Sequence, residues 1–83
     1  MADLARLTRQ LGSIIRGARK QAGLSQFELG EKAGFRQETI SVLETGNPSA
    51  KLGTILAVLA ALDLELQVAP RTRGDQFDIE AIF

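Results

Sequence analysis

Five polar side chains occupy six consecutive positions near the middle of this 83-residue chain: Arg36, Gln37, Glu38, Thr39 and Ser41. Arginine donates hydrogen bonds, glutamate accepts them, and the other three do both, so the cluster can bind a patterned polar surface. The chain has no His and no Cys, the residues that most often serve as general base, thiol nucleophile or zinc ligand. We therefore predict recognition by hydrogen bonding, with no enzyme activity, no metal and no cofactor.

The segment before this cluster carries the signals of a short helix. Ser25, followed three residues later by Glu28, is a capping box, in which each side chain bonds the backbone N–H of the other residue. A helix is therefore expected over residues 26–33, with Leu29 turned toward the core. Gly34 ends this helix, because glycine readily adopts the left-handed conformation that follows many helices.

The cluster itself lies on a second short helix, which begins near Arg36 or Gln37. Ile40 and Leu43 are three positions apart and anchor this helix to the core, so the polar residues around them face outward. Gly46 and the Asn-Pro pair that follows it end the helix. Two short helices joined by a tight glycine turn form a helix-turn-helix.

Two longer helical patterns flank this pair. The first has one apolar face and is stopped by Gly23; the face consists of Leu7, Leu11, Ile14, Ile15 and Ala18. The second begins at Ser49 or Lys51 and has apolar residues at the helical period: Leu52, Ile55, Leu56, Leu59 and Leu62. The predicted fold class is therefore all-α, with a four- to five-helix domain of helix-turn-helix type over residues 1–62.

The periodicity changes after the last helix. Leu64, Leu66 and Val68 alternate with other residues until Pro70, which is the pattern of a short β-strand. A single strand leaves its backbone hydrogen-bonding groups unpaired, and the same strand of a second copy would satisfy them. We predict that residues 63–70 pair across a homodimer. The alternative is a ragged extension of the preceding helix.

Residues 71–83 form a C-terminal tail with a flexible, polar start. Its last nine residues mix three acids with large apolar side chains, namely Phe77, Ile79, Ile82 and Phe83. A plain disordered end is poorer in such side chains. We expect the tail to fold against a partner; a frayed end packed on its own domain is the alternative.

Charge is divided unevenly along the chain. Residues 1–36 hold seven basic and three acidic residues, whereas residues 37–83 hold three basic and seven acidic ones. This asymmetry suits a polyanion partner for the first half. The longest apolar run, residues 55–62, is shorter than the roughly 20 residues needed to span a bilayer. We expect a cytoplasmic protein without membrane contact.

The stretch LSQFELGEKAGFRQETISVLETG, residues 24–46, resembles the Cro/C1 (xenobiotic-response) repressor family. The resemblance covers roughly residues 8–62. The end of the domain, KLGTILAVLAALDLELQVAP, resembles the HipB-type antitoxins, in which the last helix leads into one dimerising strand. The resemblance implies a homodimeric repressor that binds a palindromic operator in double-stranded DNA. It also implies a partner, a HipA-like serine/threonine kinase toxin.

In this class the helix carrying the cluster enters the major groove of DNA. The resemblance thus implies base contacts by Arg36, Gln37, Glu38 and Ser41. It implies phosphate contacts by Ser25, Gln26, Thr39, Arg16 and Lys51. Glu44 is expected to pair with Arg19 as a structural salt bridge rather than to act at the site.

Two residues depart from the usual family pattern. Phe27 stands where the family is commonly polar and exposed, so we regard it, with the apolar residues of the tail, as a candidate toxin contact. Gly30 replaces a commoner alanine and weakens its helix by up to about 1 kcal/mol. The sequence alone offers no firm reason for that glycine.

Three other functions are alternatives. A phage-type repressor or restriction controller would share the DNA-binding residues and lack a toxin partner. A small adaptor could use the same fold without DNA. An enzyme would need a catalytic constellation that the sequence does not assemble.

Overall fold

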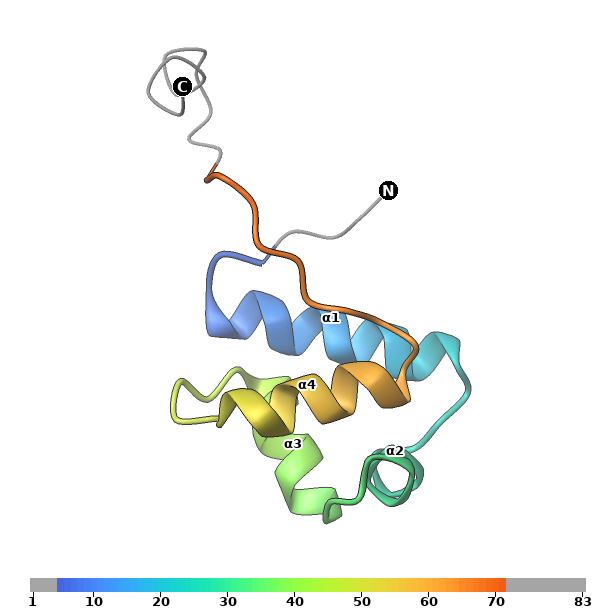
Figure 1. Cartoon of the computed structure of the whole chain (residues 1–83). Coiled ribbons are helices and arrows are strands. Elements are labelled where there is room, and N and C mark those ends of the chain that lie inside the picture. Colours follow the sequence, from blue (N-terminus) through green and yellow to red (C-terminus); the bar gives the residue numbers. More distant parts are fainter. Residues whose placement is uncertain (1–4, 72–83) are drawn as a thin grey trace.

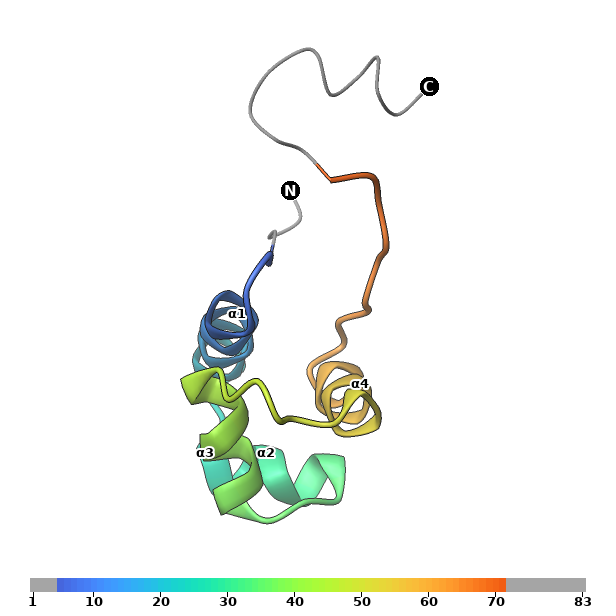
Figure 2. The ribbon, with the colours of Figure 1, turned by 90° about the vertical axis from the view of Figure 1, so that its left-hand side faces the viewer.

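The computed structural model describes residues 5–71, which form four helices. They are α1 (Thr8–Gln21), α2 (Gln26–Ala33), α3 (Gln37–Thr45) and α4 (Leu52–Ala61). α3 packs against α1 and α2, and α2 packs against α4. Figures 1 and 2 show α2 and α3 at one end of the molecule, while the segment after α4 runs toward the opposite end. The helix-turn-helix therefore stands apart from the segment predicted to dimerise.

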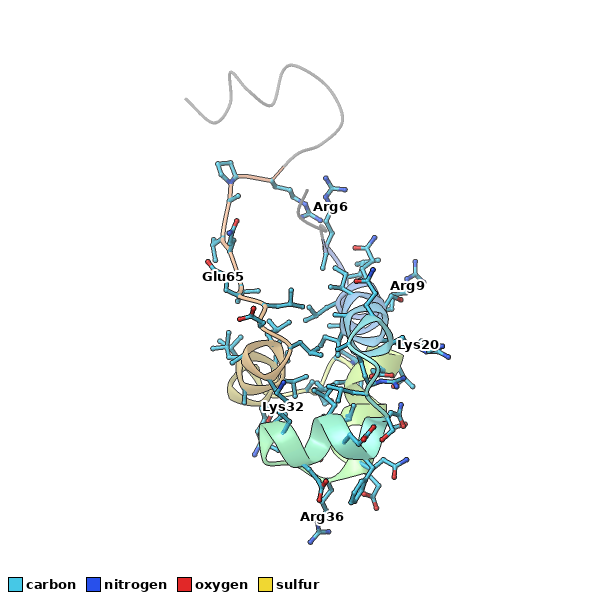
Figure 3. The ribbon with its side chains drawn as sticks, turned by 90° about the vertical axis from the view of Figure 1, so that its right-hand side faces the viewer. Arg6, Arg9, Lys20, Lys32, Arg36 and Glu65 are labelled. Carbon is cyan, nitrogen blue, oxygen red and sulfur yellow. The ribbon has the colours of Figure 1, made fainter. Side chains whose placement is uncertain are left out.

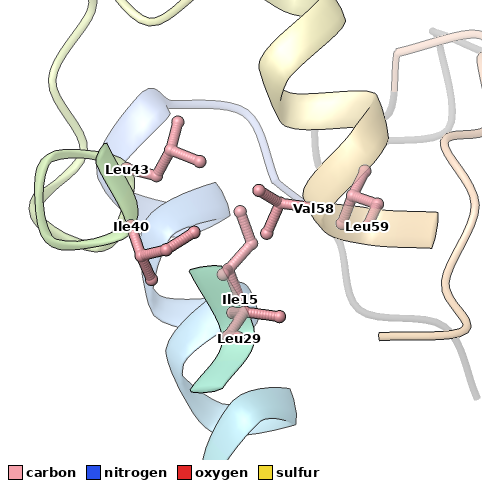
Figure 4. Packing of buried hydrophobic residues seen from close by; sticks show 6 residues of the cluster. All are labelled: Ile15, Leu29, Ile40, Leu43, Val58 and Leu59. Atoms are coloured by element: carbon pink, nitrogen blue, oxygen red, sulfur yellow. The ribbon is translucent and has the colours of Figure 1, made fainter. Parts of the chain in front are cut away.

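The core draws residues from all four helices, and they converge in Figure 4: Ile15, Leu29, Ile40, Leu43, Val58 and Leu59. Full burial of such a side chain contributes about 1.5–3 kcal/mol. The anchors predicted for the two short helices, Leu29, Ile40 and Leu43, are confirmed as buried. The prediction that Leu7 belongs to the apolar face of the first helix is wrong, because Leu7 precedes α1 as its N-cap and is half exposed. The apolar face of α1 starts at Leu11 instead.

Two glycines inside helices each allow a close backbone approach in this small core. A Cβ atom on Gly12 of α1 would lie 2.6 Å from the carbonyl oxygens of Leu43 and Glu44 in α3. A Cβ atom on Gly30 of α2 would lie 2.6 Å from the carbonyl oxygen of Phe35. Real Cβ contacts are longer, so both positions require glycine. The turn that follows α2, therefore, is the physical reason for Gly30.

The chain after α4 has no regular secondary structure within the residues described. α4 ends at Ala61, and Asp63 adopts a left-handed φ of 61°. Residues 64–71 then follow as irregular chain. Val68 is 94% exposed. The predicted strand is thus not seen in one copy, and the continuation of α4 as a ragged helix is excluded for these residues.

Among residues 5–71, none of the helices has the length and apolar character to cross a membrane.

Candidate nucleic-acid interface

The start of α2 is held by the capping box that the sequence predicts. The Ser25 hydroxyl accepts from the Glu28 N–H at 3.0 Å, and the Ser25 N–H donates to Glu28 Oε1 at 2.8 Å. Gly34 follows α2 with φ of 86°, in the left-handed region. The two helix ends fix α2 and the short turn that leads to α3.

The N-terminus of α3 presents polar side chains to solvent. Arg36 is the N-cap residue, with φ −77° and ψ 157°, and no side-chain hydrogen bond caps the helix there. Arg36, Gln37 and Glu38 are exposed, and Ser41 is half-buried. Figure 3 shows Arg36 pointing away from the helices at the α2–α3 end, far from Glu65 in the C-terminal segment. The four side chains expected to face bases thus lie together at the N-cap and on the first two turns of α3.

Val42 also belongs to this outward face, although the sequence reasoning did not select it. Relative to Glu38, Ser41, Val42 and Thr45 stand at i+3, i+4 and i+7, the spacing that places residues on one side of a helix. Val42 is 42% exposed. An apolar side chain gives no hydrogen-bonding signal in the sequence. Its helical register relative to Glu38 would have identified it.

A hydrogen-bonded network centred on Glu44 of α3 joins α3 to α1 and to the start of α2. The Arg19 guanidinium donates to Glu44 at 2.6 Å from Nε to Oε2 and at 3.1 Å from Nη2 to Oε1. Arg19 Nη1 also donates to the Leu24 carbonyl at 2.8 Å. The side chains of Arg19 and Glu44 are only 11% and 3% exposed. The predicted structural salt bridge is confirmed.

Gln26 joins this network at the first turn of α2. Its Nε2 donates to Glu44 Oε1 at 3.1 Å. A glutamine amide has two N–H donors, so one donor remains for another acceptor. Glu44 therefore orients Gln26, a contact that the sequence reasoning did not foresee.

The remaining phosphate candidates are spread over several elements. Ser25 precedes α2 and is exposed, although its hydroxyl already caps the helix. Thr39 on α3 is half-buried. Arg16 on α1 and Lys51, the N-cap of α4, are exposed. These four positions lie on or next to different helices, and among the described residues none of the four hydrogen-bonds to Glu44.

The solvent side of α1 is strongly basic. Residues 8–21 contain no acid, and the exposed cations Arg9, Arg16 and Lys20 stand at i, i+7 and i+11. Figure 3 shows Arg9 and Lys20 projecting from α1 on the same side. A helix with this charge attracts polyanions at distances up to about one Debye length, roughly 8–10 Å.

One of the candidate toxin contacts, Phe27, lies within the residues that the structure describes. Phe27 on α2 is 56% exposed, so it is available to a partner. The other candidates, Phe77, Ile79, Ile82 and Phe83, lie outside residues 5–71.

Comparison with known proteins places this geometry in context. A helix-turn-helix family model matches residues 15–68. An uncharacterised helix-turn-helix transcriptional regulator of Sinorhizobium fredii, y4dL, is 37% identical over 68 residues; the match spans 82% of this chain and 35% of that longer protein. A second one from the same organism, y4mF, is 35% identical and matched over 88% of this chain and 97% of its own length. The antitoxin HipB of an Escherichia coli strain is 35% identical over 76 residues, covering 86% of this chain and 81% of HipB.

Solved structures agree with the sequence comparison. A HipB variant in complex with an O2 20mer has a TM-score of 0.77 and 29% identity, over 83% of this chain and 96% of that one. A chain of a HipA–HipB–O2–O3 complex has a TM-score of 0.73 and 30% identity over the same shares.

Proposed function

Because the chain belongs to the helix-turn-helix family of DNA-binding regulators, we propose that it is a homodimeric repressor of a palindromic operator, working in the cytoplasm. The observation that carries the proposal is the outward polar face on the first two turns of α3. In this class the recognition helix enters the major groove with its N-terminal residues on the base edges. The exposed end of the molecule formed by α2 and α3 leaves room for such docking (Figure 2).

The base-reading chemistry follows from the side chains present. Gln37 can donate to and accept from adenine N7 and N6, and Arg36 can donate to guanine O6 and N7. Glu38 can accept from cytosine N4, or hold Arg36 in position. Ser41 can serve either way. Each good bidentate contact discriminates against a wrong base by about 1–3 kcal/mol.

The backbone contacts would orient α3 in the groove. Gln26 has a free amide donor at the N-terminus of α2, where the helix dipole favours an anion. Ser25, Thr39, Arg16 and Lys51 complete the proposed phosphate contacts. Such contacts position the protein on the duplex but carry no sequence information directly.

Dimerisation would bring two recognition helices onto successive turns of DNA. Leu64, Leu66 and Val68 are exposed in the single chain, and pairing of this segment with its copy would bury them and satisfy its backbone groups. α4 adds the exposed Leu52 and Leu56. Two recognition helices about 34 Å apart would match half-sites one helical turn apart.

We further propose that the repressor is the antitoxin of a HipA-like kinase toxin and regulates its own operon. The match to HipB over most of both chains supports this role. Phe27 and the apolar tail residues Phe77, Ile79, Ile82 and Phe83 are the proposed toxin contacts. The second candidate is a stand-alone transcriptional regulator without a toxin; the match over nearly the full length of y4mF, which is named only as a transcriptional regulator, fits this candidate too.

Mobility shifts with the DNA upstream of the gene test the DNA-binding proposal. Binding should fall steeply as salt rises, because phosphate neutralisation releases counterions. An affinity that does not change with salt concentration, or no binding to the upstream DNA, would refute the operator model. Gln37→Ala should weaken binding to the selected operator, while Lys32→Ala, on α2, serves as a control that removes an exposed charge outside the proposed contacts.

Deleting residues 71–83 separates the two regulatory roles. The shortened chain should retain operator binding and lose affinity for a HipA-like kinase encoded next to it. Unchanged affinity for the kinase would remove the tail from the toxin interface. The absence of any kinase binding by the full chain would favour the stand-alone regulator.

A further inference from the structure

Val42 is an apolar side chain on an otherwise polar surface. Within α3, every residue of which is described, it is the one apolar side chain that is exposed, since Ile40 and Leu43 are buried. Its 42% exposure removes it from the core. It stands one helical turn after Glu38 and next to Ser41, two proposed base-reading residues. Packing within the single chain therefore does not explain an isopropyl group at this position.

The major groove offers one apolar group, the C5-methyl of thymine. We propose that Val42 reads a thymine in each half-site by packing its isopropyl group against this methyl. The inference rests on the proposed function, because Val42 can meet a base only if α3 enters the groove. It assigns a specificity-determining role to a residue that cannot form a side-chain hydrogen bond.

Local structure holds the valine methyl groups in one place. A β-branched side chain in a helix strongly prefers a single χ1 rotamer, so both methyl groups have a fixed direction. The Thr45 hydroxyl donates to the Val42 carbonyl at 2.8 Å. The polar group next to Val42 is therefore already hydrogen-bonded to the helix backbone. The outward surface at this turn is therefore both apolar and preorganised.

The same contact would disfavour cytosine and adenine at that position. Cytosine carries the N4 amino donor and adenine the N6 amino donor in the major groove. Burying either donor against an isopropyl group leaves it without a hydrogen-bond partner, which is unfavourable. Thymine is the base that gains from the contact, because its methyl leaves water and needs no partner.

Replacement of thymine by deoxyuridine tests the proposal, because it removes only the methyl group. The purified full-length chain first selects its operator from random double-stranded oligonucleotides. Each thymine of one half-site is then replaced by deoxyuridine, and Kd is measured for the wild type, Val42→Ala and Val42→Thr. Leu7→Ala is the control, since Leu7 is a half-exposed apolar residue outside the proposed contacts.

Wild-type binding should depend on the methyl group of one thymine in the half-site. Its methyl should strengthen wild-type binding roughly fourfold per half-site, the value expected for burying one carbon group. Val42→Ala should bind the thymine and deoxyuridine operators equally well at that position. Val42→Thr keeps one γ-methyl and should keep part of the difference, and Leu7→Ala should keep all of it.

The failures can be told apart. A chain that selects no DNA overturns the proposed function and this inference together. A chain that selects an operator but discriminates at no thymine, or whose Val42→Ala variant discriminates as the wild type does, overturns the inference alone.

Discussion

Arg19 of α1 and Glu44 of α3 form a two-point ion pair beneath the candidate DNA-binding face, with 2.6 Å between Nε and Oε2. Glu44 also accepts from Gln26 of α2, so one carboxylate joins the three helices that carry the site. Through these contacts Glu44 fixes how α3 stands relative to α1 and to the start of α2. Stability and DNA binding are therefore coupled through this carboxylate.

Glu44→Ala should destabilise the fold by about 3–5 kcal/mol, because it leaves the largely buried Arg19 guanidinium without its charge partner. Urea denaturation followed by circular dichroism measures this loss. Glu31→Ala, which removes an exposed carboxylate of α2, is the matched control and should change stability by less than about 0.5 kcal/mol. Equal losses of stability in the two variants would show that the ion pair stabilises the fold no more than an exposed carboxylate does.

Two glycines of α1 should respond oppositely to alanine. Gly17→Ala meets no atom within 4 Å and should stabilise the helix by about 0.5–1 kcal/mol. Gly12→Ala drives a methyl into the backbone of α3 and should destabilise by about 1–3 kcal/mol. Thermal unfolding of both variants checks the pair, and a stabilising Gly12→Ala would contradict the close approach of α1 and α3.

Glu38→Ala should change sequence preference more than overall affinity. The carboxylate is repelled by phosphates on any DNA, but it can accept from cytosine N4 or orient Arg36 on a particular sequence. Selection of binding sites with the wild type and the variant should therefore return different bases at one position per half-site. If the variant binds every sequence more tightly by the same factor, Glu38 is only a repulsive charge.

Leu66→Asp should prevent dimerisation, because a charge would have to be buried in the proposed strand pair. Sedimentation should show a monomer, and operator affinity should fall with it. Gln67→Asp, on the alternate face of the same segment, is the control and should remain dimeric. A dimer that survives Leu66→Asp would place the interface elsewhere.

The local pattern of the sequence was enough to determine the helix-turn-helix. Ser25 and Glu28 specify a cap between residues three apart, and Gly34 specifies a left-handed end, so short-range hydrogen bonds and backbone sterics predict where α2 begins and ends. The spacing of Ile40 and Leu43 likewise predicts which side of α3 is buried and which side faces outward. The Arg19–Glu44 pair was expected from family resemblance, and its geometry is confirmed.

Contacts between residues distant in the chain were decided only by the tertiary structure. Gly12 and Gly30 are needed because packing brings carbonyl oxygens to 2.6 Å from the position that a Cβ atom would take. The periodicity of the sequence does not predict such distances. The bond from Gln26 to Glu44 arises because α2 and α3 meet at that point. Capping and helical periodicity depend on residues a few positions apart, so the sequence predicts them. Packing depends on which surfaces meet in the folded chain, and for α3 these surfaces belong to residues far away in the sequence.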